Sequence, residues 1–390
     1  MGGGGDRVVV VETAIWLDQL TAAERGELVR SGGSISEPHP DLLVVGGGIA
    51  GVAIAAACHQ AGLGTVQLIE AGHLGSGATG GATGLLTPEI HEWSDPEPFV
   101  DLARASLAQW HELEQTWPGG LGLIDVDWIG LSPDPSGLAP HQSPAVEWLD
   151  PSQVAQLIPG LSLPMAGARI HHQGRVNPLR SVARLSATLP AVSTGVAATG
   201  VTTRGDRVVA VDTTAGPIQP GAVVFATGLP PTLDGLDVAV PWERVKGHLL
   251  VTEPTAVHLP GIVAPVATQL EDGRLLVGGT FDTGDESPVV RPEIIDSILA
   301  GLYATLPELR GLRADYQWCC FRPRHPDGMP VIDRIHGLRN AWLTSGHYRT
   351  GILNAPFTAQ ALARWISSDE PPAEASTWSS DRFAGRGLHG

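Results

Sequence analysis

A glycine-rich turn lies between two apolar runs near the N-terminus. The run at 42–45 leads into Gly46, Gly48 and Gly51, and the next run ends at Glu70. This spacing is the dinucleotide-binding fingerprint, in which a strand feeds a tight turn and then a helix whose N-terminal N–H groups face a pyrophosphate. Gly46 permits the turn, Gly48 lets the pyrophosphate approach, and Gly51 allows close helix–strand packing. Glu70 is placed to bind ribose hydroxyls, and its charge disfavours a 2′-phosphate.

Two blocks far along the chain carry arginines. They are Phe321-Arg322-Pro323-Arg324-His325-Pro326-Asp327-Gly328-Met329-Pro330 and Gly346-His347-Tyr348-Arg349-Thr350-Gly351-Ile352. A planar guanidinium holds a carboxylate through two parallel N–H···O bonds, which suits a small substrate with few other groups to grip. Strand alternation puts Trp318, Cys320 and Arg322 on one face, so Cys320 should face the same cavity as Arg322.

Small residues also gather at 75–84, where Gly75-Ser76-Gly77-Ala78-Thr79-Gly80-Gly81-Ala82-Thr83-Gly84 forms a loop. Such a loop lets the backbone approach a flat ligand closely. A buried strand at 221–228 ends in Ala226, Thr227 and Gly228, and we expect it beside the first fingerprint strand.

The order of these segments predicts two interleaved domains in an α/β fold. A Rossmann-like, nucleotide-binding domain is expected from residues 41–90, 174–232 and 322–370. An antiparallel-sheet α+β substrate domain is expected from residues 91–173 and 233–321.

The two ends of the chain are expected to lie outside these domains. Residues 1–40 form an N-terminal extension in which Thr21 and Glu24 make a capping box for a short helix. We interpret this extension as an appended arm or the product of a mis-set start codon, in preference to an oligomer contact or a pocket lid. Residues 371–390 are expected to be a flexible tail.

Composition excludes several classes of protein. The 390 residues include 43% apolar ones, and 24 basic against 41 acidic residues give a formal charge of −17. Nucleic acid and anionic membranes are therefore poor partners. Three cysteines give neither a disulfide framework nor metal-ligand spacing, and no secretory signal is visible, so a cytoplasmic location is expected. The sequence leaves a homo-oligomer open.

The motifs quoted above occur in the same order in the glycine oxidase group of the D-amino acid oxidase superfamily. The chain resembles that group over roughly residues 41–367. The resemblance implies non-covalent FAD rather than NAD, two domains, an amino acid substrate oxidised at the amine next to its carboxylate, and molecular oxygen as the final electron acceptor.

The resemblance also implies roles for individual residues. Arg322 takes the carboxylate-binding role, with Phe281 and Tyr348 beside it in the substrate pocket, and the Gly346–Ile352 block opens the last helix at the pyrimidine edge of the flavin. The implied FAD-binding residues are Gly46, Gly48, Ile49, Ala50, Gly51, Glu70, Ala78, Thr79, Gly81, Ala82, Thr83, Gly84, Ala226, Thr227, Gly228, His347, Tyr348, Arg349, Thr350, Gly351 and Ile352.

Two positions bear on finer questions. Related sarcosine-oxidising enzymes attach FAD to a cysteine at about the position of Cys320, but Arg322 matches the group whose flavin is not covalently held. Glycine oxidases commonly carry a tyrosine ahead of the Gly-Arg-Leu strand, and the same offset from Gly273 here falls near Val266. A valine there would enlarge the pocket beyond what glycine needs.

The sequence therefore predicts an FAD-dependent oxidase of glycine or of an N-substituted glycine. Members of the resembled family that act on N-carboxymethyl amino acids release a β-amino acid for polyketide assembly, which suits an enlarged pocket. The alternatives are a flavin amine dehydrogenase with another electron acceptor, a sarcosine or D-amino acid oxidase, and a non-enzymatic flavoprotein.

Overall fold

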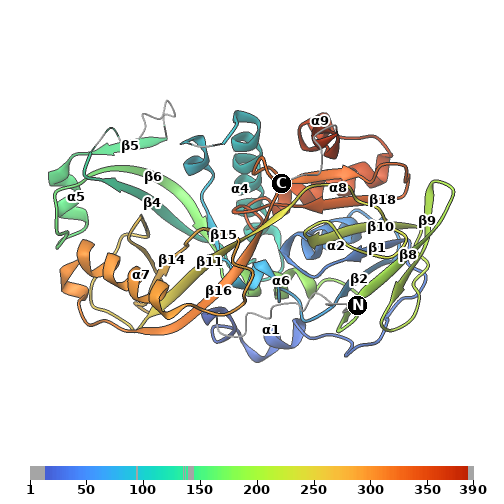
Figure 1. Ribbon diagram of the computed structural model, residues 1–390, viewed down its shortest axis with the longest axis horizontal. Helices are drawn as coiled ribbons and strands as arrows, with labels where there is room; N and C mark the ends of the chain where they lie inside the picture. Colours follow the sequence, from blue (N-terminus) through green and yellow to red (C-terminus); the bar gives the residue numbers. More distant parts are fainter. Residues whose placement is uncertain (1–13, 94, 135, 137, 139–144, 385–390) are drawn as a thin grey trace.

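Two sheets lie side by side along the long axis of the molecule (Figure 1). The structure, a computed structural model, describes residues 14–93, 95–134, 136, 138 and 145–384. The sheet on the right of Figure 1 has the strand order β17-β18-β10-β1-β2-β7. The sheet on the left has the order β15-β11-β14-β13-β12-β4-β6-β3, with β16 paired to β11 and β5 to β6.

The elements in and around the first sheet are η1 (Ile15–Leu17), α1 (Ala22–Glu27), β1 (Leu42–Val45), α2 (Ile49–Gln60), β2 (Val66–Glu70), α3 (Ala78–Gly81), α6 (Pro178–Ser186), β7 (Ala191–Thr194), β8 (Ala198–Arg204), β9 (Arg207–Thr213), β10 (Ala222–Gly228), β17 (Val331–Arg334), β18 (Ala341–Ser345), α8 (Ala355–Ser368), α9 (Ala375–Trp378) and η5 (Ser380–Phe383). Strand β1 runs parallel to both β2 and β10, and β10 runs parallel to β18. This is the Rossmann-like arrangement that the sequence predicts, and that prediction is confirmed.

The remaining elements are β3 (Leu85–Leu86), η2 (Pro88–Trp93), α4 (Glu97–Thr116), β4 (Ile124–Ser132), β5 (Val146–Leu149), α5 (Pro151–Leu157), β6 (Ala166–Arg175), β11 (Glu243–Thr252), β12 (Ile262–Ala264), β13 (Ala267–Gln269), β14 (Leu275–Gly278), β15 (Asp282–Thr283), α7 (Pro292–Thr305), η4 (Pro307–Leu309) and β16 (Ala314–Arg324). Pairing in this second sheet is antiparallel except between β12 and β4.

The second sheet buries a different set of side chains on each face. Leu249, Leu276 and Trp318 belong to the core shared with the first domain. Leu250 and Val277, one residue further along their strands, belong to a separate core beneath α5 and α7. Because successive strand side chains alternate, the face that carries Leu249, Leu276 and Trp318 is turned toward the first domain, whereas Trp128 and Ile170 on β4 and β6 pack in a further core of their own.

Two elements, α4 and β16, connect the two predicted domains. Helix α4, expected in the substrate domain, packs on α8: the Trp110 indole N–H donates to the carbonyl oxygens of Ile352 (3.2 Å) and Leu353 (3.1 Å). The predicted boundary at 322 falls inside β16, whose pairing with β11 continues to Arg324.

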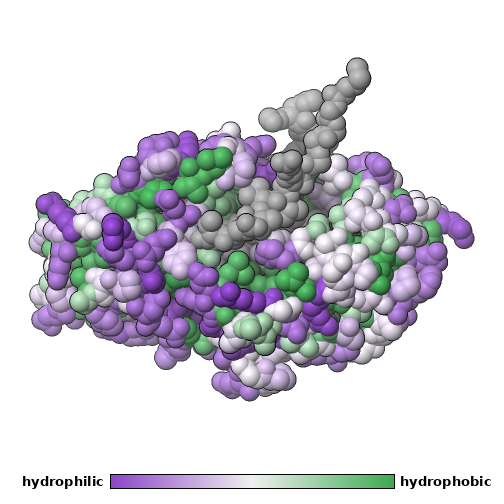
Figure 2. Space-filling view, turned by 90° about the horizontal axis from the view of Figure 1, so that it is seen from below, coloured by the Kyte–Doolittle hydropathy of each residue, from purple (hydrophilic) through white to green (hydrophobic). Residues whose placement is uncertain are grey.

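The described part of the N-terminal extension is not a loose arm. Trp16 and Leu28 are 1% and 2% exposed, and Thr21 and Glu24 form the capping box of α1 as the sequence predicts. Figure 2 views the molecule from below, the side on which α1 lies in Figure 1, and its hydrophobic residues gather in separate patches among hydrophilic ones. Residues 14–40 therefore pack several apolar side chains into the fold, although Val29 is 65% exposed; residues 1–13 lie outside the described part of the chain.

The C-terminal segment is also docked as far as residue 384. Trp378 and Phe383 are buried, and the Asp333 carboxylate accepts hydrogen bonds from Ser379 Oγ (2.9 Å) and the Ser380 N–H (2.7 Å). The tail expected to be flexible is thus held against β17, and residues 385–390 lie outside the described part. No helix in the described ranges is both long and apolar enough to cross a bilayer.

Candidate cofactor and substrate site

A cavity of about 420 Å³ opens along the carboxyl ends of β1, β2 and β10, where open α/β sheets bind ligands. Most of the residues predicted to hold the cofactor line it. They are Gly46, Gly48, Ile49, Ala50, Glu70, Ala78, Thr79, Ala82, Thr83, Gly84, Ala226, Thr227, Gly228, His347, Tyr348, Arg349, Gly351 and Ile352. Segments far apart in the sequence therefore meet around one space.

Some predicted residues lie outside the lining, and other residues join it. Gly51, Gly81 and Thr350 of the predicted cofactor set, and Arg322, Phe281 and Val266 of the predicted substrate set, are not part of it. The residues that sequence reasoning missed are Val45, Ile69, Ala71, Ser76, Gly77, Leu85, Val196, Ala197, Ala198, Pro231, Thr232, Leu233, Pro323 and Thr344. Ser76, Gly77 and Pro323 stand in blocks quoted from the sequence but were not assigned to the cofactor, and most of the others are small or apolar residues on connections between elements.

The glycine turn brings backbone segments closer than any side chain would allow. A Cβ on Gly51 would lie 1.9 Å from the carbonyl oxygen of Gly46. Gly46 has φ of 112°, and its Cβ would lie 2.4 Å from the carbonyl oxygen of Ala226. Gly51 therefore does not line the cavity; it lies behind the lining residues and lets α2 start directly against the turn.

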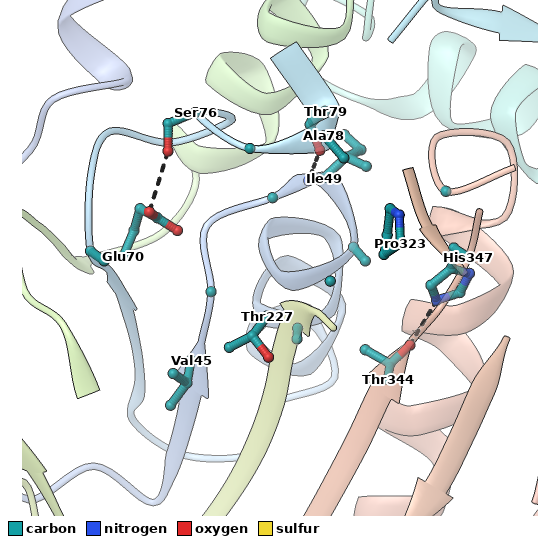
Figure 3. Close-up of a pocket in the computed structure, with 18 of the residues that line it drawn as sticks. Val45, Ile49, Glu70, Ser76, Ala78, Thr79, Thr227, Pro323, Thr344 and His347 are labelled. Atoms are coloured by element: carbon teal, nitrogen blue, oxygen red, sulfur yellow. Dashed lines mark hydrogen bonds between the residues drawn. The ribbon is translucent and has the colours of Figure 1, made fainter. Parts of the chain in front are cut away.

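The start of α2 offers hydrogen-bond donors to the cavity, and the end of β2 offers the Glu70 carboxylate, an acceptor (Figure 3). Thr79 Oγ1 accepts the Ile49 N–H at 3.1 Å, so α3 and the start of α2 are joined. The N–H groups of the first turn of a helix have no partner within the helix, which suits an anion. The Glu70 carboxylate accepts the N–H groups of Gly47 (2.7 Å) and Gly72 (2.8 Å), which fixes it at the edge of the cavity.

His347 marks the opposite end of the cavity. Its Nε2 lies 2.8 Å from Thr344 Oγ1, as Figure 3 shows, while its buried Nδ1 has no partner among the described residues. Burial lowers the pKa of His347 to about 4, and the neighbouring His325 contributes in the same direction, so the ring is neutral at pH 7. In the described chain, the N–H groups of Gly351 and Ile352, which also line this end, meet no protein acceptor.

These observations fit the cofactor that the sequence predicts. An anion-binding helix start lies near the middle of the cavity and a fixed carboxylate lies at one end. Free N–H groups and an orphaned imidazole nitrogen lie at the other end. Pyrophosphate, ribose and a flavin pyrimidine edge have the complementary chemistry, so the residues present fit FAD.

Arg322 lies on the face of the second sheet that is turned toward the first domain. Its Nη1 donates to the carbonyl oxygen of Thr280 at 2.9 Å, and its Cζ lies 4.8 Å from the centre of the Phe281 ring. Among the described residues it pairs with no carboxylate. Burial lowers the pKa of Arg322, and the positive charge of Arg349 adds to the effect. The guanidinium is therefore a partly desolvated cation without a counter-ion.

Gly247 provides the room that this guanidinium occupies. A Cβ at Gly247 would lie 2.4 Å from Nη1 and 2.6 Å from Nη2 of Arg322. Gly247 stands on β11 opposite Cys320, two pairs along from Arg322. Arg324, by contrast, has its carboxylate partner: its Nη1 lies 2.7 Å from Glu243 Oε1, and its Cζ lies 5.3 Å from the Tyr348 ring centre.

The structure does not bring Val266 to this face. Val266 is 4% exposed and belongs to the core beneath α5 and α7, on the far side of the sheet. The residue of β13 that faces the first domain is Thr268, which stands opposite Ile262 and Leu276. Val266 stands in the turn between β12 and β13, outside either strand, so counting back from Gly273 could not fix the direction of its side chain.

A second buried cation shares this face and was not predicted. Arg175 stands opposite Leu85, which lines the cavity, and direct cross-strand partners point to the same side. Arg175 is 9% exposed, and its Nε has no partner among the described residues. Two positions earlier, the Oε1 of Gln173 is likewise buried without a partner. Burial lowers the pKa of Arg175.

Comparisons with known proteins agree with this geometry. The sequence model of the family described as FAD dependent oxidoreductase matches residues 41–365. The chain is 28% identical to a glycine oxidase of Pseudomonas aeruginosa over 358 residues, which covers 85% of this chain and 95% of that protein. The crystal structure of glycine oxidase from Geobacillus kaustophilus has a TM-score of 0.78 and 25% identity, and covers 89% of this chain and all of that chain. Iminodiacetate oxidase from Chelativorans sp. BNC1 shares the fold, with a TM-score of 0.68 and 20% identity over 87% of this chain and 98% of that one.

The depressed pKa of His347 predicts acid sensitivity. The folded pKa of about 4 lies below the value near 6.5 in the unfolded chain, so the unfolded state binds the extra proton between these values. The free energy of unfolding should therefore fall as the pH drops from about 6.5 toward 4, by up to ~3 kcal/mol from this group. Urea unfolding at several pH values should show a shallower slope in His347→Gln than in the wild type. Equal pH dependence in the wild type and in His347→Gln would contradict the lowered pKa of His347.

The buried Cys320 thiol predicts that the cofactor is held without a covalent bond. Cys320 is 4% exposed, and burial raises the pKa of its thiol to about 11, so almost no thiolate is present near neutral pH. Acid precipitation of the yellow protein should leave the colour in the supernatant. Colour that stays in the pellet of the wild type but not of Cys320→Ser would contradict this prediction.

Proposed function

Because this chain belongs to the FAD-dependent oxidoreductase family and is an FAD-dependent amino acid oxidase, we propose that its substrate is glycine or an N-substituted glycine. The observation that carries the proposal is the guanidinium of Arg322, which faces the first domain without a carboxylate partner. A substrate carboxylate would supply that partner.

The protein's own part in the reaction is to bind and orient. Bound FAD supplies the two-electron oxidation of the carbon–nitrogen bond, after which water converts the imine to glyoxylate and the free amine. Arg322 holds the substrate carboxylate in two parallel hydrogen bonds, and this contact fixes the α-carbon next to it. The lone Thr280 carbonyl contact leaves most of the guanidinium donors free for the substrate.

The surroundings of Arg322 keep its fork in place. The Phe281 ring covers one side of the guanidinium, and Gly247 leaves space beneath it. A cation stacked on an aromatic face is attracted by the ring and loses little freedom when the substrate binds. Lysine cannot reproduce this arrangement, because an ammonium is neither planar nor forked.

The proposal extends to substrates whose amine carries a second acidic group. Arg175 supports this extension, since it is a second buried cation on the same face of the sheet whose Nε has no hydrogen-bond partner among the described residues, although the charges of Glu271 and Asp272 act on it. An N-carboxymethyl β-amino acid has two carboxylates and would match two separated arginines. Its oxidation would release glyoxylate and a β-amino acid, the kind of product used in polyketide biosynthesis. Molecular oxygen would take the electrons and yield hydrogen peroxide.

A flavin dehydrogenase would use the same residues and a different electron acceptor. The two activities separate in one assay, in which substrate oxidation is followed with oxygen alone and then with an added electron carrier. Stoichiometric peroxide with oxygen alone supports the oxidase, and turnover that requires the carrier supports the dehydrogenase.

Replacing Arg322 tests the carboxylate site. Arg322→Ala should leave FAD bound and lower kcat/KM by about 3 kcal/mol, or roughly two orders of magnitude, because a charge-assisted contact is lost in a desolvated site. Arg322→Lys should restore only part of the loss. Arg324→Ala is the matched control, since Arg324 already pairs with Glu243, and it should cost much less. Near-wild-type turnover in Arg322→Ala would remove this residue from the site.

Replacing Arg175 tests the second acidic group. An N-carboxymethyl amino acid should exceed glycine in kcat/KM by at least about tenfold, which requires ~1.4 kcal/mol. Arg175→Met should abolish that preference and leave glycine turnover unchanged. Arg169→Met is the matched control on the same strand, because Arg169 pairs with Asp127. If glycine is the better substrate of the wild type, or the ratio survives in Arg175→Met, plain glycine oxidation is the better reading.

A further inference from the structure

The described part of the N-terminal extension reaches the wall of the cofactor cavity. Residues 14–40 precede the segment that the family model matches, which begins at residue 41. Trp16 is nevertheless 1% exposed, and its indole N–H donates to the carbonyl oxygen of Ala82 at 2.9 Å. Ala82 lines the cavity, and so do the next residues, Thr83 and Gly84.

A second indole holds the neighbouring carbonyl. The Trp318 N–H donates to Gly81 O at 3.0 Å, so consecutive carbonyls are bonded by tryptophans from opposite ends of the chain. These carbonyls stand at the C-terminal end of α3, where helix geometry leaves such groups without an intrahelical partner. These two indoles therefore hold the backbone that enters the 82–84 loop, and the Val176 N–H, which donates to the Gly84 carbonyl oxygen at 2.9 Å, holds its other end.

The extension is fastened at Trp16 and at residues that follow it, so the indole is held in place. Asn177 Nδ2 donates to the carbonyl oxygen of Trp16 at 3.0 Å, and the Tyr316 hydroxyl lies 2.8 Å from Asp18 Oδ2. Further along, the Leu74 N–H donates to the carbonyl oxygen of Leu28 at 2.9 Å. These contacts tie the extension to α6, to β16 and to the connection that follows β2.

We propose that residues 14–40 form a strap that holds the 82–84 loop in its cofactor-binding conformation, with Trp16 as the positioning residue. Because the strap orders this loop before FAD binds, ordering the loop subtracts less from the free energy of FAD binding. The inference rests on FAD dependence alone and is independent of which amine the enzyme oxidises.

Trp16→Phe keeps a buried aromatic ring but removes the N–H together with the five-membered part of the indole, a loss of volume that the control variant shares. The measured quantities are the dissociation constant of FAD, from flavin fluorescence as the holoenzyme is diluted, and the stability of the FAD-free chain. We expect FAD to bind about tenfold more weakly, which corresponds to ~1.4 kcal/mol. Trp117→Phe is the matched control: Trp117 is 6% exposed and donates to Arg184 O, away from the cavity, so FAD affinity should not change.

Two outcomes overturn the proposal. The first is that Trp16→Phe binds FAD with the same dissociation constant as the wild type. Any loss of stability in this variant would then be the same for the FAD-bound and the FAD-free chain. The other comes from the wild type and does not depend on a variant that folds. If the strap favours FAD binding, bound FAD must stabilise the strap in turn, because coupling between two sites is reciprocal. FAD should therefore slow amide hydrogen exchange in residues 15–30, and equal exchange rates with and without FAD would contradict the proposal. Slower exchange together with weaker binding in the variant supports it.

Discussion

The charge on Arg322 is the constraint around which the proposed substrate site is arranged. A guanidinium removed from water without a counter-ion costs free energy, and this cost is recovered when an anion binds. The structure accommodates the cation with one backbone carbonyl, one aromatic ring and one glycine: Thr280 O, Phe281 and Gly247. None of these neutralises the charge. Under the proposed function, this charge favours a substrate with a carboxylate over an amine that lacks one.

Around the cofactor cavity, close contacts between backbone segments are the main constraint, as the charge of Arg322 is at the proposed substrate site. Close approach at Gly46 and Gly51 puts the start of α2 against the turn, where only glycine fits. Three buried tryptophans, Trp16, Trp110 and Trp318, then donate their indole N–H groups to carbonyl oxygens of segments that line the cavity or adjoin it. Large rings with one polar atom both fill the core and fix the backbone, which two separate residues would otherwise have to do.

Local requirements explain what could be predicted from the sequence. The glycine fingerprint has a meaning at each position because steric limits act within a few residues, and the Rossmann-like sheet followed from it. The shared face of Trp318 and Cys320 followed from strand alternation, and both side chains do pack in one core. The capping box at Thr21 and Glu24 was equally local.

The features that could not be predicted depend on partners far away in the sequence. Val266 was placed by counting across a turn; it stands in the turn between β12 and β13, where its packing in the core beneath α5 and α7 sets its direction. Arg175 stands in no motif, and only its pairing with Leu85 relates it to the cavity. The role of the extension depends on Trp16 reaching Ala82, a contact across 66 positions. No local pattern encodes such a contact.

The most direct test of the account is a crystal structure of the FAD-bound enzyme with methoxyacetate, a carboxylate that resembles N-methylglycine but has no amine to oxidise. The account predicts that both carboxylate oxygens lie within hydrogen-bonding distance of Arg322, over Gly247 and beside Phe281. A carboxylate bound elsewhere in the cavity, with the Arg322 guanidinium still bonded only to the Thr280 carbonyl, would contradict it.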